Sequence, residues 1–211
     1  MAILNSRPDR LPSEPLSIDR ADVGARLRHR RKDCGLTLKE LSGRSGVTLS
    51  MISKAERGEV ALTYDKFAAL ARALGMDFRD LFGAPDTAVS PGQFSLTRAG
   101  EHVVYRTGSY GYGMLAADLT DKRMVPMRAT ISARRIEEFA DYVRHPGEEF
   151  VYLLTGEIKI CFEDGREARL GPGDSLYFHS GVGHLYLSTG PGDAEAVVVC
   201  TEEAARGEGE I

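Results

Sequence analysis

The sequence has no apolar stretch that approaches the ~18–20 residues needed to cross a membrane. Its N-terminus also lacks the apolar core of a signal peptide. Only three cysteines are present, Cys34, Cys161 and Cys200, and no two of them have CxxC spacing. These absences argue against membrane proteins, secreted proteins and cysteine zinc knuckles. We therefore expect a soluble, cytoplasmic protein with buried, reduced thiols.

The chain has no net positive charge, with 27 Lys and Arg against 31 Asp and Glu, but its charges are unevenly distributed. Residues 20–58 contain ten Lys and Arg against four acids, a net of +6. A local basic cluster of this kind is what phosphate binding requires, whatever the sum over the chain. A solvated helix face is the simpler alternative.

A length of 211 residues exceeds one typical domain of ~100–150 residues, so two compact units are expected. The first half has apolar residues at helical spacing, and Thr37 precedes Glu40 by the three residues of a capping box. The second half has short runs rich in Val, Ile, Tyr, Phe and Thr, which are typical of strands. We predict a multidomain α and β protein with a five-helix bundle followed by a β-barrel. The expected segments are a flexible leader at 1–19, a helical domain at 20–82 with helices near 20–33, 37–44, 48–56, 63–74 and 77–82, a linker at 83–92, a β-domain at 93–201 and an acidic tail at 202–211.

Residues 36–59 have the pattern of two short helices joined by a tight turn. Gly46 allows the two helices to cross closely, Val47 fills the core between them, and Ile52 anchors the second helix from behind. The opposite face of that second helix is then free to enter the major groove of DNA. The side chains expected to point outward are Thr48, Ser50, Met51 and Lys54.

The letters GVTLSMISKAERG, with the preceding TLKELS, resemble the phage-repressor-like helix-turn-helix family called Xre over about residues 20–82. The resemblance implies operator DNA as the partner. It also places Arg31 and Glu56 at the positions of a buried ion pair that joins the first helix to the end of the third. Leu49 departs from the family's usual polar residue and could touch a thymine methyl. The DNA-binding residues that the resemblance implies are Thr37, Thr48, Leu49, Ser50 and Lys54.

The alternative for this domain is a helical module that only mediates protein contacts. The net charge of +6 argues against that alternative, because a dimerisation module has no need of ten cations.

Two blocks of the second half carry histidine and glutamate. His145 precedes Glu149 by four residues, and His184 lies in the later block LGPGDSLYFHSGVGHLYLS. Residues an even number apart on a strand share a face, so His145 and Glu149 would point to one interior, unless Pro146 and Gly147 interrupt the strand.

These blocks resemble the two motifs of the cupin family, over roughly residues 112–201. The resemblance implies a double-stranded β-helix in which His145, Glu149 and His184 are metal ligands. The first histidine position of the motif is occupied by Val143. In addition, His179 replaces a usual proline and Ser188 a usual asparagine.

The implied cofactor is a divalent metal, Fe, Mn, Ni or Zn. Two histidines and one carboxylate form a facial triad that can bind non-haem Fe(II), so a cupin oxygenase similar to the hydroxypropylphosphonate epoxidases is one alternative. A metal-free polar pocket is another. We favour a homodimeric, sequence-specific DNA-binding transcriptional regulator that is not an enzyme and whose cupin domain senses a small molecule or a metal.

Overall fold

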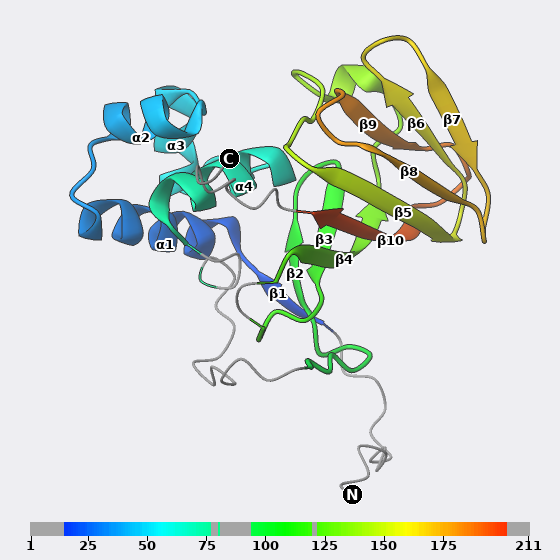
Figure 1. The fold of residues 1–211 in the computed structure, drawn as a ribbon, viewed down its shortest axis with the longest axis horizontal. Helices are drawn as coiled ribbons and strands as arrows, with labels where there is room; N and C mark the ends of the chain where they lie inside the picture. Colours follow the sequence, from blue (N-terminus) through cyan, green and yellow to red (C-terminus); the bar gives the residue numbers. More distant parts are fainter. Residues whose placement is uncertain (1–14, 77–79, 81–93, 120–121, 202–211) are drawn as a thin grey trace, which may run out of the picture.

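The computed structural model describes residues 15–76, 80, 94–119 and 122–201, which form an α-helical domain and a β-domain (Figure 1). Within these ranges, no helix combines the length and the apolar character that a membrane span requires. The predicted linker at 83–92 and acidic tail at 202–211 lie outside the described residues.

The helical domain contains four α-helices among the described residues, rather than the five expected. The fifth was expected at 77–82, a range of which only Asp80 is described. The other four predicted helices are confirmed to within one residue at each end. They are α1 (Arg20–Asp33), α2 (Leu38–Ser45), α3 (Leu49–Glu56) and α4 (Tyr64–Leu74).

The helix boundaries follow from local chemistry. Thr37 and Glu40 form the predicted capping box at the start of α2. Gly46 ends the same helix with a φ of 72°, a left-handed conformation that favours glycine. Ile52 on α3 has no exposed surface, and Gly24 on α1 packs so closely on α3 that a Cβ there would lie 2.1 Å from the carbonyl oxygen of Ala55. The short turn and this close approach fix the position of α3.

The β-domain consists of two sheets that share one apolar core. The larger sheet has the strand order β1-β2-β3-β4-β10-β5-β8, and the smaller has the order β7-β6-β9. The strands are β1 (Leu16–Ile18), β2 (Val103–Arg106), β3 (Tyr110–Met114), β4 (Met124–Ile131), β5 (Glu148–Thr155), β6 (Ile158–Phe162), β7 (Glu167–Leu170), β8 (Ser175–His179), β9 (His184–Ser188) and β10 (Ala194–Thr201).

Part of the expected flexible leader is a strand. β1 pairs in parallel with β2, with Leu16 opposite Val103. Because β1 directly precedes α1, this pairing ties the start of the helical domain to the edge of the β-domain sheet (Figure 1). The leader prediction was wrong for these residues because a three-residue strand is stabilised by its partner rather than by its own sequence.

The two domains also touch at the start of α4. The backbone N–H of Leu62 donates a 2.8 Å hydrogen bond to the hydroxyl of Tyr105, which is 1% exposed. The ring of Phe67 on α4 meets the ring of Tyr105 edge to face, with centroids 5.6 Å apart. The helical domain is therefore docked on the barrel at the base of α4.

All three cysteines are free, as expected, but only Cys161 and Cys200 are buried. Cys34 is exposed, contrary to the expectation, because it caps the C-terminus of α1 beyond the apolar face of that helix.

Candidate functional site

The surface expected to contact DNA is formed by the N-termini of α2 and α3. The side chain of Thr48 caps α3 by accepting a 3.3 Å hydrogen bond from the backbone N–H of Met51. Met51 itself is partly buried against the core, so its expected outward position was wrong. The residues implied as DNA-binding are all exposed, namely Thr37, Thr48, Leu49, Ser50 and Lys54.

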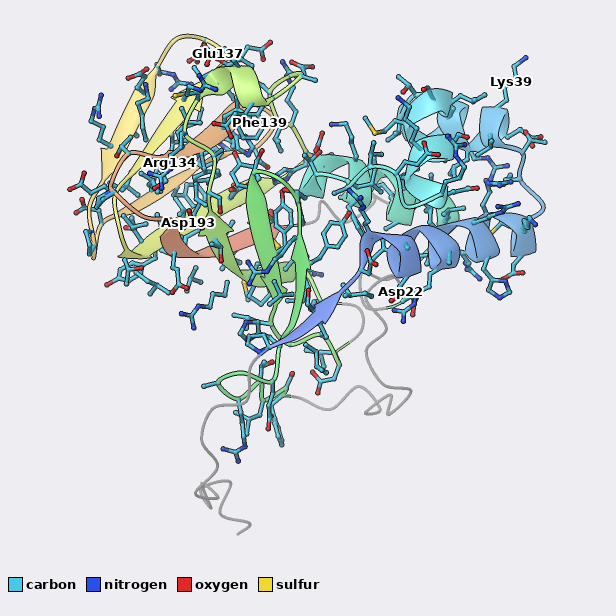
Figure 2. The ribbon with its side chains drawn as sticks, turned by 180° about the vertical axis from the view of Figure 1, so that it is seen from behind. Asp22, Lys39, Arg134, Glu137, Phe139 and Asp193 are labelled. Atoms are coloured by element: carbon cyan, nitrogen blue, oxygen red, sulfur yellow. The ribbon has the colours of Figure 1, made fainter. Side chains whose placement is uncertain are left out.

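Exposed basic side chains lie on the helices of this domain. Figure 2 shows Lys39, on α2, pointing away from the β-domain at the far end of the helical domain. The last turn of α1 adds Arg30 and Lys32, and α3 carries Lys54. A surface with this charge attracts the phosphates of duplex DNA.

The ion pair predicted between Arg31 and Glu56 is confirmed. Arg31 donates from Nε and Nη2 to the two carboxylate oxygens of Glu56, at 2.6 and 2.8 Å, and the side chains are only 11% and 5% exposed. The same guanidinium donates a 2.8 Å hydrogen bond to the carbonyl of Leu36. The pair therefore joins α1 to α3 and to the loop before α2.

The second site is inside the β-domain, around the carboxylate of Glu149, which is 3% exposed. His145 Nε2 lies 2.8 Å and His184 Nε2 lies 3.4 Å from Glu149 Oε2. The hydroxyl of Tyr186 donates a 2.5 Å hydrogen bond to the other carboxylate oxygen. The three residues that the sequence indicated as ligands thus lie in one place.

The predicted strand parity does not explain how His145 reaches Glu149. β5 begins at Glu148, so His145 lies before the strand, and the parity argument does not apply to it. Gly147 separates the two residues with a φ of 94°, and a Cβ there would lie 2.4 Å from the carbonyl oxygen of Thr201. A hydrogen bond of 3.1 Å from the backbone N–H of His145 to the carbonyl of Ser180 holds the loop.

The two imidazoles are oriented by backbone carbonyls. His184 Nδ1 lies 2.9 Å from the carbonyl of Val182, and His145 Nδ1 lies 3.3 Å from that of Pro146. A carbonyl can only accept, so each Nδ1 donates to its carbonyl, and each Nε2 faces Glu149, where it donates a hydrogen bond and can coordinate an ion once that proton is released. This is the arrangement by which proteins orient histidine ligands of metals.

The charges of the cluster are coupled. Burial alone would raise the pKa of Glu149, but the hydrogen bonds and charges of His145 and His184 outweigh burial and hold that pKa far below its usual value. Burial lowers the pKa of His184, but its hydrogen bond to Glu149, the charge of that carboxylate and its hydrogen bond to Val182 together raise that pKa above its usual value. Glu149 is therefore an anion with two imidazoles directed at it.

A cavity of about 50 Å³ lies beside this cluster. That volume accommodates an ion with a few water molecules. Cys200 and a tyrosine of the helical domain, Tyr64, also line it. The remaining wall is apolar or aromatic, made by Tyr110, Tyr112, Met127, Ala129, Ile131, Val143, Tyr186 and Val198.

Known proteins resemble the chain along most of its length. Residues 22–82 match the helix-turn-helix domain family, and residues 137–200 match the cupin domain family. The HTH-type transcriptional regulator PuuR of Escherichia coli (strain K12) is 26% identical over 176 residues, which cover 80% of this chain and 89% of PuuR. The chain is an Xre-like helix-turn-helix DNA-binding regulator with a cupin domain.

A solved structure of a transcriptional regulator shows the same fold. An HTH_3 family transcriptional regulator from Vibrio cholerae superposes with a TM-score of 0.61 at 19% identity, covering 88% of this chain and 97% of that one. Hydroxypropylphosphonic acid epoxidase from S. wedmorenis covers 86% of this chain and 98% of its own, at 22% identity and a TM-score of 0.46. A likeness this weak carries no argument about the chemistry of the regulator.

The donor set of the regulator fits a divalent metal. One anionic carboxylate and two imidazoles whose Nε2 atoms face it are ligands suited to Fe, Mn, Ni or Zn, because binding the ion releases the Nε2 protons. His145, Glu149 and His184 would hold such an ion, which would supply Lewis acidity and open coordination positions for water or an effector.

Two residues of this site were missed by the sequence analysis. Cys200 lies on β10 directly opposite Glu149 in the strand register, and Tyr64 comes from α4 of the other domain. The alternation of buried residues on β10 could have shown that Cys200 faces the interior. Nothing local to Tyr64 distinguishes it from an ordinary helix core residue.

Proposed function

We propose that this regulator binds operator DNA as a homodimer in the bacterial cytoplasm, and that the occupant of its cupin cavity changes operator affinity. The proposed DNA contacts are made by Thr37, Thr48, Leu49, Ser50 and Lys54, and the proposed occupant is a divalent metal held by His145, Glu149 and His184. The observation that carries the proposal is the position of Tyr64, which belongs to the helical domain and yet forms a wall of the cavity.

Tyr64 contacts the ligand cluster directly. Its ring meets the ring of His145 edge to face, with centroids 4.9 Å apart and an interplanar angle of 74°. A side-chain hydrogen bond links Tyr64 to the thiol of Cys200. Any ion that draws His145 toward itself therefore changes the packing of Tyr64.

Tyr64 is also the first residue of α4, so a shift there reaches the DNA-binding surface. α4 packs on α2, and α2 packs on α3, the helix proposed to enter the major groove. A ligand changes an equilibrium only by its differential affinity for two states, and contact with Tyr64 supplies such a difference.

Replacing Tyr64 by leucine is expected to uncouple the two domains. In the wild type, we expect operator affinity to differ about 5–150-fold between metal-loaded and chelator-stripped protein, the usual range of coupling between sites. In Tyr64→Leu the ratio should fall toward unity, while the metal content remains stoichiometric. Fluorescence anisotropy with an operator selected from random DNA measures both affinities.

The matched control is Tyr177→Leu, which removes a tyrosine that is 57% exposed on β8 and should leave the ratio unchanged. Equal operator affinity of the loaded and stripped wild-type protein would contradict the proposed regulation.

Recognition of DNA is tested on α3. Lys54→Ala and Ser50→Ala are each expected to weaken binding to the selected operator, by about 1–3 kcal/mol where a base contact is lost. Affinity should fall steeply with salt, and loss of a phosphate contact at Lys54 should lower the salt slope by about one. Lys159→Ala, on β6, is the control and should bind normally.

The homodimer is proposed because one domain of this size makes too few contacts for specific affinity. A two-fold symmetric operator with half-sites about one DNA turn apart is its expected signature in the selection. Undetectable or salt-independent binding to every selected sequence would remove the DNA-binding surface from consideration.

A second candidate, a non-haem iron oxygenase, is favoured by one feature, the set of two imidazoles and a carboxylate. It differs from the regulator in consuming oxygen with a substrate when loaded with Fe(II). Oxygen uptake by the iron-loaded protein, with and without candidate substrates, separates the two.

A further inference from the structure

Cys200 is the least explained side chain of the cavity. It is 1% exposed, on β10, directly opposite Glu149 on β5. The motif's first histidine position is occupied by Val143, whose side chain has no ligand atom and also lines the cavity. The cluster therefore lacks a third nitrogen donor, and the same cavity contains a thiol.

The thiol is at ligand distance from the other donors. Its Sγ lies 3.6 Å from Glu149 Oε2 and 3.9 Å from His145 Nε2, and the ligand atoms of these three residues all lie within 4.8 Å of one another. His184 is not a member of this group of three, but its Nε2 lies 3.4 Å from Glu149 Oε2. Metal–ligand bonds of about 2.0–2.3 Å place the ligands of a tetrahedral ion about 3.3–3.6 Å apart.

We propose that Cys200 is a metal ligand of this site, which makes the donor set two imidazoles, one carboxylate and one thiolate. The proposal rests on the proposed metal site and specifies its chemistry. A thiolate is a soft donor, so it favours Zn²⁺, Co²⁺ or Fe²⁺ and disfavours Mn²⁺ and Mg²⁺, which prefer oxygen. Through its soft thiolate, Cys200 then makes the site select Zn²⁺, Co²⁺ or Fe²⁺ over Mn²⁺ and Mg²⁺.

The simpler role for Cys200 is packing. Free cysteines are among the most buried residues and often act as small apolar groups. Packing does not by itself require the sulfur to face a carboxylate and an imidazole at distances close to the edges of a tetrahedron. The two roles differ in one observable, because only a metal-bound thiolate gives sulfur-to-metal charge transfer.

The test uses the full chain loaded with Co²⁺. Wild-type protein with stoichiometric cobalt is expected to show an intense near-ultraviolet thiolate-to-cobalt band in addition to weak visible bands. Cys200→Ser should lose the near-ultraviolet band and bind Co²⁺ at least about 10-fold more weakly, while its affinity for Mn²⁺ changes less. Cys34→Ser and Cys161→Ser are controls that should retain the band.

The wild-type spectrum alone can overturn the proposal, so the test does not depend on how the variant folds. Stoichiometric cobalt without the charge-transfer band would show that Cys200 is not a ligand and would leave the proposed metal site intact. No bound cobalt in the wild type would overturn both the thiolate ligand and the metal occupant, whereas DNA binding by α3 is measured separately.

Discussion

Replacing Glu56 by alanine is expected to lower the free energy of unfolding of the helical domain by about 3–5 kcal/mol. The Arg31 side chain is 11% exposed in the wild type, and the substitution removes the carboxylate that its guanidinium pairs with. An uncompensated buried charge loses hydration that nothing replaces, and this loss exceeds the gain that the pair gave in the first place. Urea unfolding of the full chain, followed by far-ultraviolet circular dichroism, measures the change.

The chain contains its own control for that experiment. Arg57 and Glu59 also form a doubly hydrogen-bonded pair, at 2.6 and 2.9 Å, but their side chains are 48% and 50% exposed. Glu59→Ala should cost far less stability than Glu56→Ala, because exposed pairs are screened by water. Equal effects of the two substitutions would show that burial does not set the strength of the Arg31–Glu56 pair.

Replacing Glu149 by glutamine is expected to lower affinity for divalent metal by more than about 100-fold. Substitutions that only disturb the residues behind a ligand already cost 10–100-fold, and Glu149 provides the carboxylate at the centre of the cluster. Glutamine keeps the shape of the side chain but removes its negative charge. Isothermal titration with Zn²⁺ or Co²⁺ measures the affinity.

Glu148→Gln is the matched control, since Glu148 precedes Glu149 on β5 and its side chain is 42% exposed. It should bind metal as the wild type does. If both variants retain wild-type affinity, the ion is bound elsewhere and the cupin cavity is not a metal site.

The helix-turn-helix could be predicted in detail from the sequence because its determinants are local. The Thr37 capping box, the turn at Gly46 and the apolar position of Ile52 all act within a few residues along the chain. The ion pair between Arg31 and Glu56 spans 25 residues and came from the family resemblance, not from any local pattern.

The resemblance to the cupin family identified the candidate metal ligands, but the strand-parity argument for His145 was wrong. His145 does not share a strand with Glu149, because Gly147 turns the chain before β5 begins. The convergence is instead maintained by a backbone hydrogen bond to Ser180, which lies 35 residues later in the sequence. Strand parity cannot anticipate a contact of that range.

The sequence by itself determined the two-domain organisation and the helices of the helix-turn-helix, because periodicity, capping and turn chemistry are read over short stretches. Only the tertiary structure decided that Leu16–Ile18 form a strand, that Cys200 faces Glu149 and that Tyr64 enters the cavity. Each of these depends on strand pairing or domain docking between segments far apart in the chain. Such contacts are selected by the packing of the whole core, and no local pattern encodes which distant partner a residue meets.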